Sequence, residues 1–323
     1  MNIAAYSLGI PKIENLKDFS NEINLSEYTL QRVLSSVNKQ YNVGKIPKKD
    51  QSFRTIFIPS NALRAIQTWI LRNILDLISI HPSAMAFRKN TTIKNNVEVH
   101  IDNQFYLCMD VQDYFPSVGK NKVYQLFHSI GFNKQMALIF SNFCTYENFL
   151  PQGAVTSPSI SNLVNIKLDR RINGFCSIRN IVYTRYADDF VFSSNNSDKL
   201  KKSISTLKTI IEDEGYKLND SKTRLLSPGN KRKITGLIVS DKNKISIGRE
   251  KRRKLRARIH HSIFKLEEDK NLASWYEMHI NGWLSFLKDV DQISYQHLVD
   301  YKMKLEDKKK KQDELMDELT SVF

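Results

Sequence analysis

Apolar residues recur along the chain with two different spacings, which predict helices in some segments and strands in others. Helical spacing occurs in "LSEYTLQRVLSSVNKQY" near the N-terminus and in "NALRAIQTWILRNILDLIS" further on. Between them, Phe53 to Ile58 is typical of a strand and ends at Pro59. The second helix is predicted to be strongly amphipathic, with one apolar face formed by Leu63, Ile66, Ile70, Ile74 and Leu77.

The middle of the chain alternates predicted strands and helices, which favours an α+β core. Side chains of "QFYLCMDVQDYF" point alternately to two faces, and this core strand would deliver Asp110 at its end. A turn-rich loop, "FLPQGAVTSPSISNLVNIKLDRRI", leads into a helix, and "KITGLIVSDKNKISIG" predicts a hairpin. Further elements are expected as helices at about 121–130, 134–144 and 198–214 and as a hairpin at 183–193.

The C-terminal part of the chain is strongly basic. Residues 249–258 contain seven basic residues and one acidic residue, and an apolar helical stripe runs along Leu255, Ile259, Ile263 and Leu266. Such a helix can pack on the protein with one face and track a phosphate backbone with the other. The alternative, a merely solvated helix face, would usually mix charges of both signs. The tail "KLEDKKKKQDELMDEL" is expected to be frayed or a loosely held helix without an assigned role.

Composition then narrows the class of partner. The 323 residues are 41% hydrophobic, which fits a globular protein with a core. A net charge of +15 indicates a polyanion partner, either nucleic acid or an anionic membrane surface. No apolar run approaches the ~18 residues that span a bilayer, and the N-terminus lacks the features of a secretory signal. Nucleic acid inside a cell is therefore favoured, with no membrane partner.

The cysteines agree with an intracellular protein. Cys108, Cys144 and Cys176 are far apart and lie in apolar sequence, so they are expected to be buried thiols in a reducing compartment. Because the histidines do not cluster with cysteines, a structural zinc site is not expected.

Adjacent carboxylates in "IVYTRYADDFVFSS" are the first candidate for chemistry. Asp188 and Asp189 could simply form a turn, or they could form a divalent-metal site at a hairpin tip. Asp110 also ends an apolar strand, and adjacent strands could bring all three carboxylates together. Their mutual repulsion would keep at least one protonated unless a cation binds, and Mg²⁺ prefers oxygen ligands. Because neighbouring strand residues point to opposite faces, we predict Asp188 as the direct ligand beside Asp110, with Asp189 secondary.

Four segments, taken in order, resemble motifs A to D of reverse transcriptases: "MDVQDYFPS", "LPQGAVTSP", "YTRYADDFVFS" and "GYKLNDSKT". A single YxDD is weak evidence, whereas all four in order are specific, and the resemblance covers about residues 45–300. Further segments resemble bacterial retron reverse transcriptases: "FRTIFIPSNALRAIQTWILRNIL", "NNVEVH", "RYADD", "KITGLIVS" and "GWLSF". That family carries an Asn-Ala-x-x-His element and a Val-Thr-Gly element. Here Val97 replaces the Ala and Ile234 replaces the Val, and both substitutions keep apolar character.

The resemblance implies an α+β, right-hand polymerase fold with fingers, a palm built of an antiparallel sheet with helices, and a helical thumb. The expected parts are an N-terminal helical extension at 1–44, fingers and palm at 45–240, and a basic helical thumb with the C-terminal tail at 241–323. Within the second part, the resemblance places fingers at about 45–103 and 117–160, and palm at about 104–116 and 161–240.

It also implies roles for the site. Asp110, Asp188, Asp189 and the Val111 carbonyl would hold two Mg²⁺ ions, with Mn²⁺ possible in vitro. Two such ions ~4 Å apart activate a 3′-hydroxyl and stabilise the leaving pyrophosphate. Lys222 matches the motif D lysine that could protonate this pyrophosphate, and a plain surface lysine is the alternative.

Nucleotide binding is implied for a second group of residues. Phe115 matches the steric gate that excludes a ribose 2′-hydroxyl, with ordinary core packing as the alternative, and Asp113 would orient the triphosphate pocket or cap locally. Gln152 and Gly153 match the motif that contacts the incoming nucleotide and the template. Arg54 fits the triphosphate clamp of the fingers, because guanidinium binds phosphate as a fork, and either Lys48 or Lys49 could assist.

The resemblance implies that the retron element contacts the cognate RNA, with an incidental histidine as the alternative. It also places the basic helix in the thumb, where several basic residues suffice because duplex RNA is recognised mainly by shape and backbone. The residues are Asn96, His100, Arg249, Lys251, Arg252, Arg253 and Arg256.

The resemblance further implies a reaction and its partners. A retron enzyme binds a cognate structured noncoding RNA (msr-msd) and copies part of it with dNTPs into multicopy single-stranded DNA (msDNA). This DNA is branched from a guanosine 2′-hydroxyl, and host RNase H removes the template. A separate effector or toxin protein would complete an anti-phage defence system in the bacterial cytoplasm.

Three alternatives stay open. One is another stand-alone bacterial reverse transcriptase, such as an intron maturase or a different defence-associated type. A maturase would usually add a DNA-binding or endonuclease segment after the thumb. An RNA-dependent RNA polymerase is disfavoured by Phe115 and by YADD in place of GDD. A catalytically idle RNA-binding or antitoxin-like scaffold is disfavoured because it would not keep three crowded carboxylates.

Overall fold

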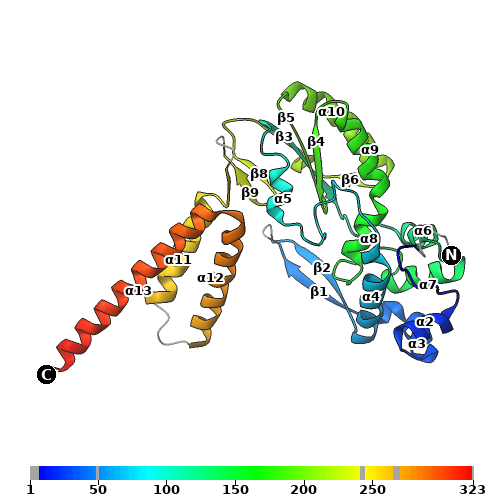
Figure 1. Ribbon diagram of the computed structural model, residues 1–323, viewed down its shortest axis with the longest axis horizontal. Helices are drawn as coiled ribbons and strands as arrows, with labels where there is room; N and C mark the ends of the chain where they lie inside the picture. Colours follow the sequence, from blue (N-terminus) through cyan, green and yellow to red (C-terminus); the bar gives the residue numbers. More distant parts are fainter. Residues whose placement is uncertain (1–6, 49–50, 241–243, 265–269, 322–323) are drawn as a thin grey trace. The chain divides into compact units, whose positions relative to one another are not determined.

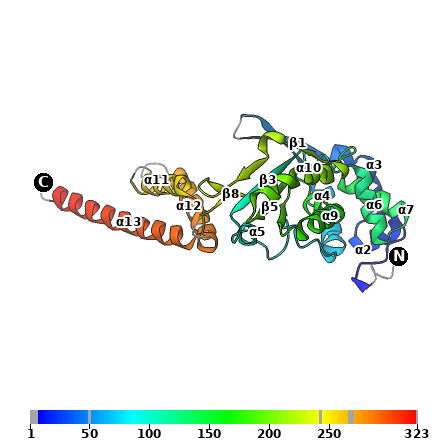
Figure 2. The same cartoon turned by 90° about the horizontal axis from the view of Figure 1, so that it is seen from above.

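The computed structural model describes residues 7–48, 51–240, 244–264 and 270–321, and the chain forms two compact units (Figures 1 and 2). Unit 1 consists of Met1–Thr92 and Phe105–Leu225, and unit 2 consists of Ile93–Gln104 and Leu226–Phe323. The segment 93–104, which the sequence prediction places largely with the fingers, therefore packs with the C-terminal part of the chain.

A five-stranded sheet organises unit 1. Its order is β4-β5-β3-β6, β7 also pairs with β3, and β3 runs antiparallel to both β5 and β6. Helices α9 and α10 pack together on one side of it (Figure 1). The bounds are β3 (Phe105–Gln112), β4 (Val182–Tyr186), β5 (Asp189–Ser194), β6 (Lys217–Leu218), β7 (Arg224–Leu226), α9 (Ile166–Ser177) and α10 (Ser197–Asp213). The predicted core strand and the predicted 183–193 hairpin are thus confirmed.

A second, two-stranded sheet in unit 1 is the antiparallel hairpin of β1 (Tyr41–Pro47) and β2 (Phe53–Pro59). The chain then enters α4 (Asn61–Asn73), where the Ser60 hydroxyl caps the helix by accepting from the Leu63 amide at 3.3 Å. Four of the five predicted apolar positions of this segment are fully buried. The exception is Leu77, which is 37% exposed because the helix ends before it and a short 3₁₀ turn, η2 (Leu75–Leu77), follows.

The remaining helices of unit 1 enclose an aromatic core. Phe19 contacts Phe140 and Trp69 edge to face, with ring centroids 5.1 and 5.2 Å apart. Cys144 and Cys176 are buried, Cys108 is partly buried, and all three are free thiols, as predicted. These helices are α2 (Leu16–Ile23), α3 (Glu27–Ser35), α6 (Lys120–Ile130), α7 (Lys134–Cys144) and α8 (Ser157–Val164), with 3₁₀ turns η1 (Val37–Gln40) and η3 (Asp220–Lys222).

Unit 2 contains a three-stranded sheet where the sequence predicts a single hairpin. Its order is β10-β9-β8, formed by β8 (Arg232–Ile234), β9 (Leu237–Val239) and β10 (Ile245–Ser246). The prediction was wrong about the strand number because Thr235 and Gly236 themselves form a tight turn, with φ of +44° and +92°. This turn splits the first predicted strand into β8 and β9.

Three helices pack together in unit 2: α11 (Arg249–Phe264), α12 (Lys270–Val290) and α13 (Gln292–Ser321). Leu255 and Ile259 of the predicted stripe are buried, Ile263 is partly buried, and Leu266 lies outside the described residues. The charged tail continues α13 as one helix over its described residues. The short helix α5 (Ile93–Glu98) packs on β9 and β10. Within the described ranges, no helix has the length and apolar character needed to cross a membrane.

Candidate active site

The three predicted metal-binding carboxylates meet at one end of the sheet of unit 1. Asp110 on β3 lies directly opposite Asp189 on β5, so their side chains project from the same face. The prediction that Asp188 lies beside Asp110, with Asp189 secondary, disagrees with this register, because Asp188 belongs to the turn that precedes β5. Ala187 and Asp188 form the turn between β4 and β5, and Ala187 has φ of +56°. The Asp188 carbonyl accepts a hydrogen bond from the Val111 amide at 3.1 Å, which fixes this turn against β3.

Electrostatic strain accompanies this crowding. Burial, followed by the charges of Asp188 and Asp110, raises the pKa of Asp189 to about 6. Burial and the Asp110 charge also raise the pKa of Asp188. Lys222 Nζ donates to Asp110 Oδ1 at 2.8 Å, and this hydrogen bond raises the pKa of Lys222. The lysine predicted from motif D thus lies beside the carboxylates and partly compensates their charge.

The donor set suits a hard divalent cation. Carboxylate and carbonyl oxygens are the ligands that Mg²⁺ prefers, and Asp110, Asp188, Asp189 and Val111 offer only such atoms. The described residues contain no group of three acidic, histidine or cysteine side chains already arranged around a metal position. The fit to Mg²⁺ thus lies in the oxygen donors that these residues offer.

The predicted nucleotide-binding loop lies on strand β2, which carries Arg54. The Gln152 carbonyl accepts from the Phe57 amide at 2.8 Å. Gly153 has φ of +116°, and a Cβ there would lie 2.7 Å from the Phe57 carbonyl oxygen, so only glycine fits. Arg54 is exposed, and its positive charge lowers the pKa of Asp188 relative to what burial alone would give. Of the two possible assisting lysines, Lys48 follows β1, while Lys49 lies outside the described residues.

Phe115 lies in the turn that follows β3. Asp113 has φ of +44°, ends the strand, and accepts at its carbonyl from the Ser117 amide at 2.8 Å. The exposed Asp113 carboxylate and the partly buried Phe115 ring follow Asp110 closely in the chain. The Phe115 ring contacts Phe87, with ring centroids 6.1 Å apart. Phe87, which sequence reasoning missed, is 49% exposed and has φ of +57°.

The two retron-like elements meet in unit 2. Asn96 and His100 are both fully buried, and Asn96 Nδ2 donates to Thr235 Oγ1 at 3.3 Å. Burial lowers the pKa of His100 to about 3, so this histidine is neutral. The prediction that these two side chains contact RNA directly disagrees with their burial. The hydrogen bond from Asn96 to Thr235 indicates that Asn96 holds α5 against the β8–β9 turn.

The predicted basic residues lie on α11 and divide into two groups. Arg249, Arg253 and Arg256 are exposed, whereas Lys251 and Arg252 are partly buried. Lys251 Nζ lies 5.5 Å from the Trp283 ring and donates to the Gly236 carbonyl at 3.4 Å, so it also holds α11 in place. The Arg256 guanidinium lies 4.3 Å from the Tyr301 ring.

Sequence reasoning also missed a buried arginine. Arg185, three positions before Asp188, is fully buried and forms a bidentate ion pair with Asp169 at 2.7 and 2.8 Å. The signal was available, since an arginine within an apolar strand needs a buried partner.

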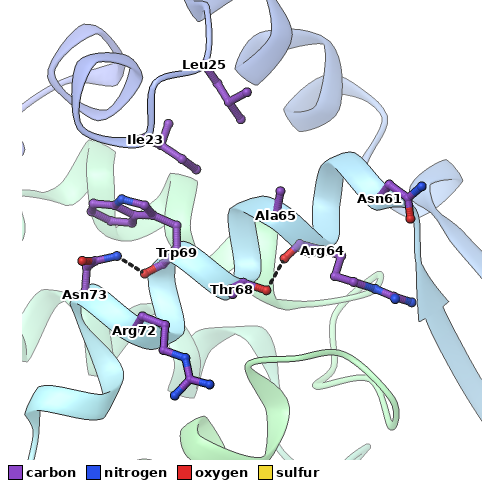
Figure 3. Close-up of a pocket in the computed structure, with 9 residues that line it drawn as sticks. All are labelled: Ile23, Leu25, Asn61, Arg64, Ala65, Thr68, Trp69, Arg72 and Asn73. Carbon is purple, nitrogen blue, oxygen red and sulfur yellow. Dashed lines mark hydrogen bonds between the residues drawn. The ribbon is translucent and has the colours of Figure 1, made fainter.

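A groove of about 600 Å³ lies elsewhere in unit 1 (Figure 3). Ile23, Leu25 and the α4 residue Trp69 form its apolar part, and the Arg64 and Arg72 side chains lie at its edge (Figure 3). None of its lining residues belongs to the carboxylate cluster or to the predicted nucleotide site.

Comparison with known proteins identifies the class. Residues 46–252 match the family of reverse transcriptases (RNA-dependent DNA polymerases). The chain is 40% identical to the Retron Ec86 reverse transcriptase of Escherichia coli over 94% of its own length and 92% of that protein. It is 30% identical to the Retron Ec73 reverse transcriptase of E. coli, covering 78% of this chain and 84% of that one. With the Retron Mx65 reverse transcriptase of Myxococcus xanthus it shares 27% identity over 82% of this chain and 64% of that one.

Among solved structures, the telomerase of Candida albicans is similar with a TM-score of 0.49 and 11% identity, covering 85% of this chain and 62% of that chain. The chain belongs to the reverse transcriptase family, with the α+β, right-hand polymerase fold of that family. Within it, the chain is a retron reverse transcriptase, an RNA-directed DNA polymerase.

Proposed function

We propose that this enzyme binds a structured noncoding RNA and copies part of it into msDNA that stays branched from a guanosine 2′-hydroxyl. Deoxynucleoside triphosphates are the substrates, and two Mg²⁺ ions are the cofactors. The observation that supports the polymerase step is the register of β3 and β5, which sets Asp110 opposite Asp189 with Asp188 in the adjoining turn. The similarity to retron reverse transcriptases supports the RNA and the branched DNA product. An RNA-binding scaffold without activity would gain nothing from this costly crowding of carboxylates.

When bound, the metal ions lower the pKa of the attacking hydroxyl and neutralise charge on the phosphates. The Asp110, Asp188 and Asp189 carboxylates hold the ions at the end of the sheet. Lys222 Nζ donates to Asp110 Oδ1 at 2.8 Å and so lies beside the carboxylates, where it would supply a proton to the leaving pyrophosphate. Arg54 binds the triphosphate through its planar fork of N–H donors.

The sugar and the base meet other side chains. The Phe115 ring fills the space that a ribose 2′-hydroxyl would need, which selects deoxynucleotides. Gly153 lets the nascent base pair approach the backbone closely, and Gln152 contacts the nucleotide and template. The contact between the Gln152 carbonyl and the Phe57 amide supports this, because it joins the loop to the strand that carries Arg54.

RNA binding is proposed for the exposed basic face of α11, with Arg249, Arg253 and Arg256 contacting phosphates. We assign the fingers, palm and thumb as the sequence predicts, with residues 93–104 supporting the thumb side. Host RNase H removes the copied template, the enzyme acts in the bacterial cytoplasm, and a separate effector protein makes the complex part of an anti-phage defence system.

The test is to express the protein together with its upstream flanking DNA and to extract nucleic acid after RNase treatment. A matched control carries Asp188→Asn and Asp189→Asn. We expect a discrete single-stranded DNA that is absent from the control. Activity on a generic primed RNA template without any such DNA would overturn the retron product while leaving a reverse transcriptase.

A further inference from the structure

The fully buried Arg185, near the end of β4, forms a hydrogen-bond network with several buried side chains. Its guanidinium donates to both Asp169 carboxylate oxygens, and Nη1 also donates to the Tyr114 hydroxyl at 2.7 Å and to Asn162 Oδ1 at 3.2 Å. All these partners are themselves buried. Burying these polar groups costs desolvation free energy, which is offset only if every donor and acceptor forms a hydrogen bond. The network therefore has one favoured geometry.

The Tyr114 hydroxyl uses its full hydrogen-bonding capacity. It accepts from Arg185 Nη1 and from Asn165 Nδ2 at 3.2 Å, and it donates to the Ser161 carbonyl at 3.4 Å. The Tyr114 ring also stacks on Tyr216 with centroids 5.8 Å apart. The ring therefore has little freedom to tilt or turn.

Phe115 follows directly and packs edge to face against the Tyr114 ring, with centroids 5.4 Å apart. The position of the Phe115 ring thus depends on the position of the Tyr114 ring. Because Phe115 itself is only partly buried, the core does not enclose its ring from all sides.

The same arginine fixes the second ring that touches Phe115. The Arg185 amide donates to the Ser83 carbonyl at 2.7 Å, and its carbonyl accepts from the Met85 amide at 2.8 Å. Asn162 Nδ2 donates to the Ala86 carbonyl at 2.8 Å. These bonds hold the segment that ends at Phe87, whose left-handed backbone conformation turns its ring toward Phe115.

We propose that Arg185, Asp169, Tyr114 and Asn162 are positioning residues for sugar selection, and that Phe87 is a second wall of the sugar pocket beside Phe115. The network holds both rings at a fixed separation, and the gap between the pocket wall and the incoming sugar is too narrow for a 2′-hydroxyl. This inference rests on the proposed role of Phe115 as the steric gate and adds the residues that make the gate rigid.

The test compares kcat/KM for dGTP and GTP in single-nucleotide extension of a primed RNA template with cytidine at the first templating position. The ratio of the two values does not depend on the active fraction of a preparation, so a variant that is only less stable leaves it unchanged. Tyr114→Phe removes one hydroxyl and keeps the ring. The variant loses all three hydrogen bonds that hold the Tyr114 ring, so the ring that positions Phe115 becomes freer to move. We expect the dGTP/GTP ratio to fall by about tenfold, which corresponds to about 1.4 kcal/mol.

Tyr41→Phe is the matched control, since Tyr41 is also a buried tyrosine whose hydroxyl accepts a hydrogen bond, from Gln67 Nε2 at 2.7 Å. Its ratio should equal that of the unmodified enzyme. Phe87→Ala alters a half-exposed side chain outside the buried core, and it should also lower the ratio. It keeps the inference testable even where Tyr114→Phe yields no folded protein.

Phe115→Ala separates the inference from the function on which it rests. If Phe115→Ala lowers the ratio and neither Tyr114→Phe nor Phe87→Ala does, the positioning network is refuted and the gate stands. If Phe115→Ala leaves the ratio unchanged, the gate is refuted, and the inference with it. A fall in the ratio for Tyr114→Phe and Phe87→Ala, but not for Tyr41→Phe, supports the inference.

Discussion

Replacing Gly153 with alanine tests whether the nucleotide-binding loop must lie directly on strand β2. An alanine Cβ would lie 2.7 Å from the Phe57 carbonyl oxygen and 2.8 Å from Ile56 Cγ2, both closer than a carbon atom can approach. The backbone oxygen cannot move aside as a flexible side chain could. The loop would therefore have to separate from β2 and lose the hydrogen bond between the Phe57 amide and the Gln152 carbonyl.

The magnitude follows from two contributions to the free energy of unfolding. Alanine at φ of +116° is strained, by about 1–3 kcal/mol, and the lost hydrogen bond adds about 0.5–1.5 kcal/mol. We expect Gly153→Ala to destabilise the protein by about 2–4 kcal/mol, which corresponds to roughly 5–12 °C in Tm for a domain of this size. Because the loop moves away from the strand that carries Arg54, KM for dNTPs should also rise.

Two other glycines provide controls. An alanine Cβ at Gly44 of β1 or at Gly174 of α9 would have no atom within 4 Å, and neither backbone has positive φ. Gly44→Ala should leave Tm and KM nearly unchanged, and Gly174→Ala should stabilise the helix by about 0.5–1 kcal/mol. Thermal unfolding and dNTP titrations on a primed RNA template measure all three variants. A Gly153→Ala protein with the Tm and KM of the unmodified enzyme would refute the close contact.

Further predictions concern the carboxylates, the lysine and the RNA-binding helix. The pKa of Asp189 is raised to about 6 from 3.8, so the folded state holds this proton more tightly than the unfolded state does. The free energy of unfolding is therefore undiminished below pH 3.8 and falls as pH rises towards 6. In thermal melts with EDTA, Asp189→Asn should remove this loss of stability at higher pH. Near neutral pH, Mg²⁺ should raise the Tm of the unmodified protein far more than that of the variant. Equal profiles of Tm against pH for the two proteins would contradict the crowding of the carboxylates. Lys222→Ala should lower kcat by roughly 100-fold or more with little change in dNTP KM, as expected for loss of a proton donor, and an unchanged kcat in rapid-quench assays would make Lys222 a plain surface residue. Arg253→Ala should reduce the slope of log affinity against log salt by about 1 in RNA-binding titrations, whereas Asn96→Ala should weaken unit 2 in thermal melts and leave that slope unchanged. A reduced slope for Asn96→Ala would mean that this buried side chain reaches RNA after all.

The sequence alone predicted the bounds of three helices of unit 1 closely, because there the local pattern and the tertiary contacts agree. The helices at 121–130, 134–144 and 198–214 begin and end within one residue of the observed bounds. Their apolar stripes and the capping residues Asn133 and Asn196 are local signals that packing does not override. Leu77 shows where such local prediction fails. The helical spacing of apolar residues continues to Leu77, although α4 already ends at Asn73.

Site prediction divided in the same way. Asp110, Asp188 and Asp189 could be found because strand alternation and turn chemistry are local, and their motif order is characteristic of one family. The exposure of a side chain, by contrast, depends on which distant segment covers it. Asn96 and His100 match a motif, but the motif does not show that they are buried. Their burial depends on the tertiary structure, in which α5 packs on β9 and β10.

The sequence by itself therefore determined the core strand β3, the β4–β5 hairpin, several helices, the polymerase motifs, the basic character of α11 and the three acidic residues. It missed β1, which begins inside the predicted N-terminal helical extension, and the third strand of the sheet in unit 2. The tertiary structure alone decided that β3 pairs with β5 so that Asp110 faces Asp189, and that Gly153 touches Phe57. It also decided that Arg185 joins Asp169, Tyr114 and Asn162 in one buried network. The physical reason is that strand register and hydrogen-bond partners of buried groups are set by contacts between residues far apart in the chain, which no local pattern records.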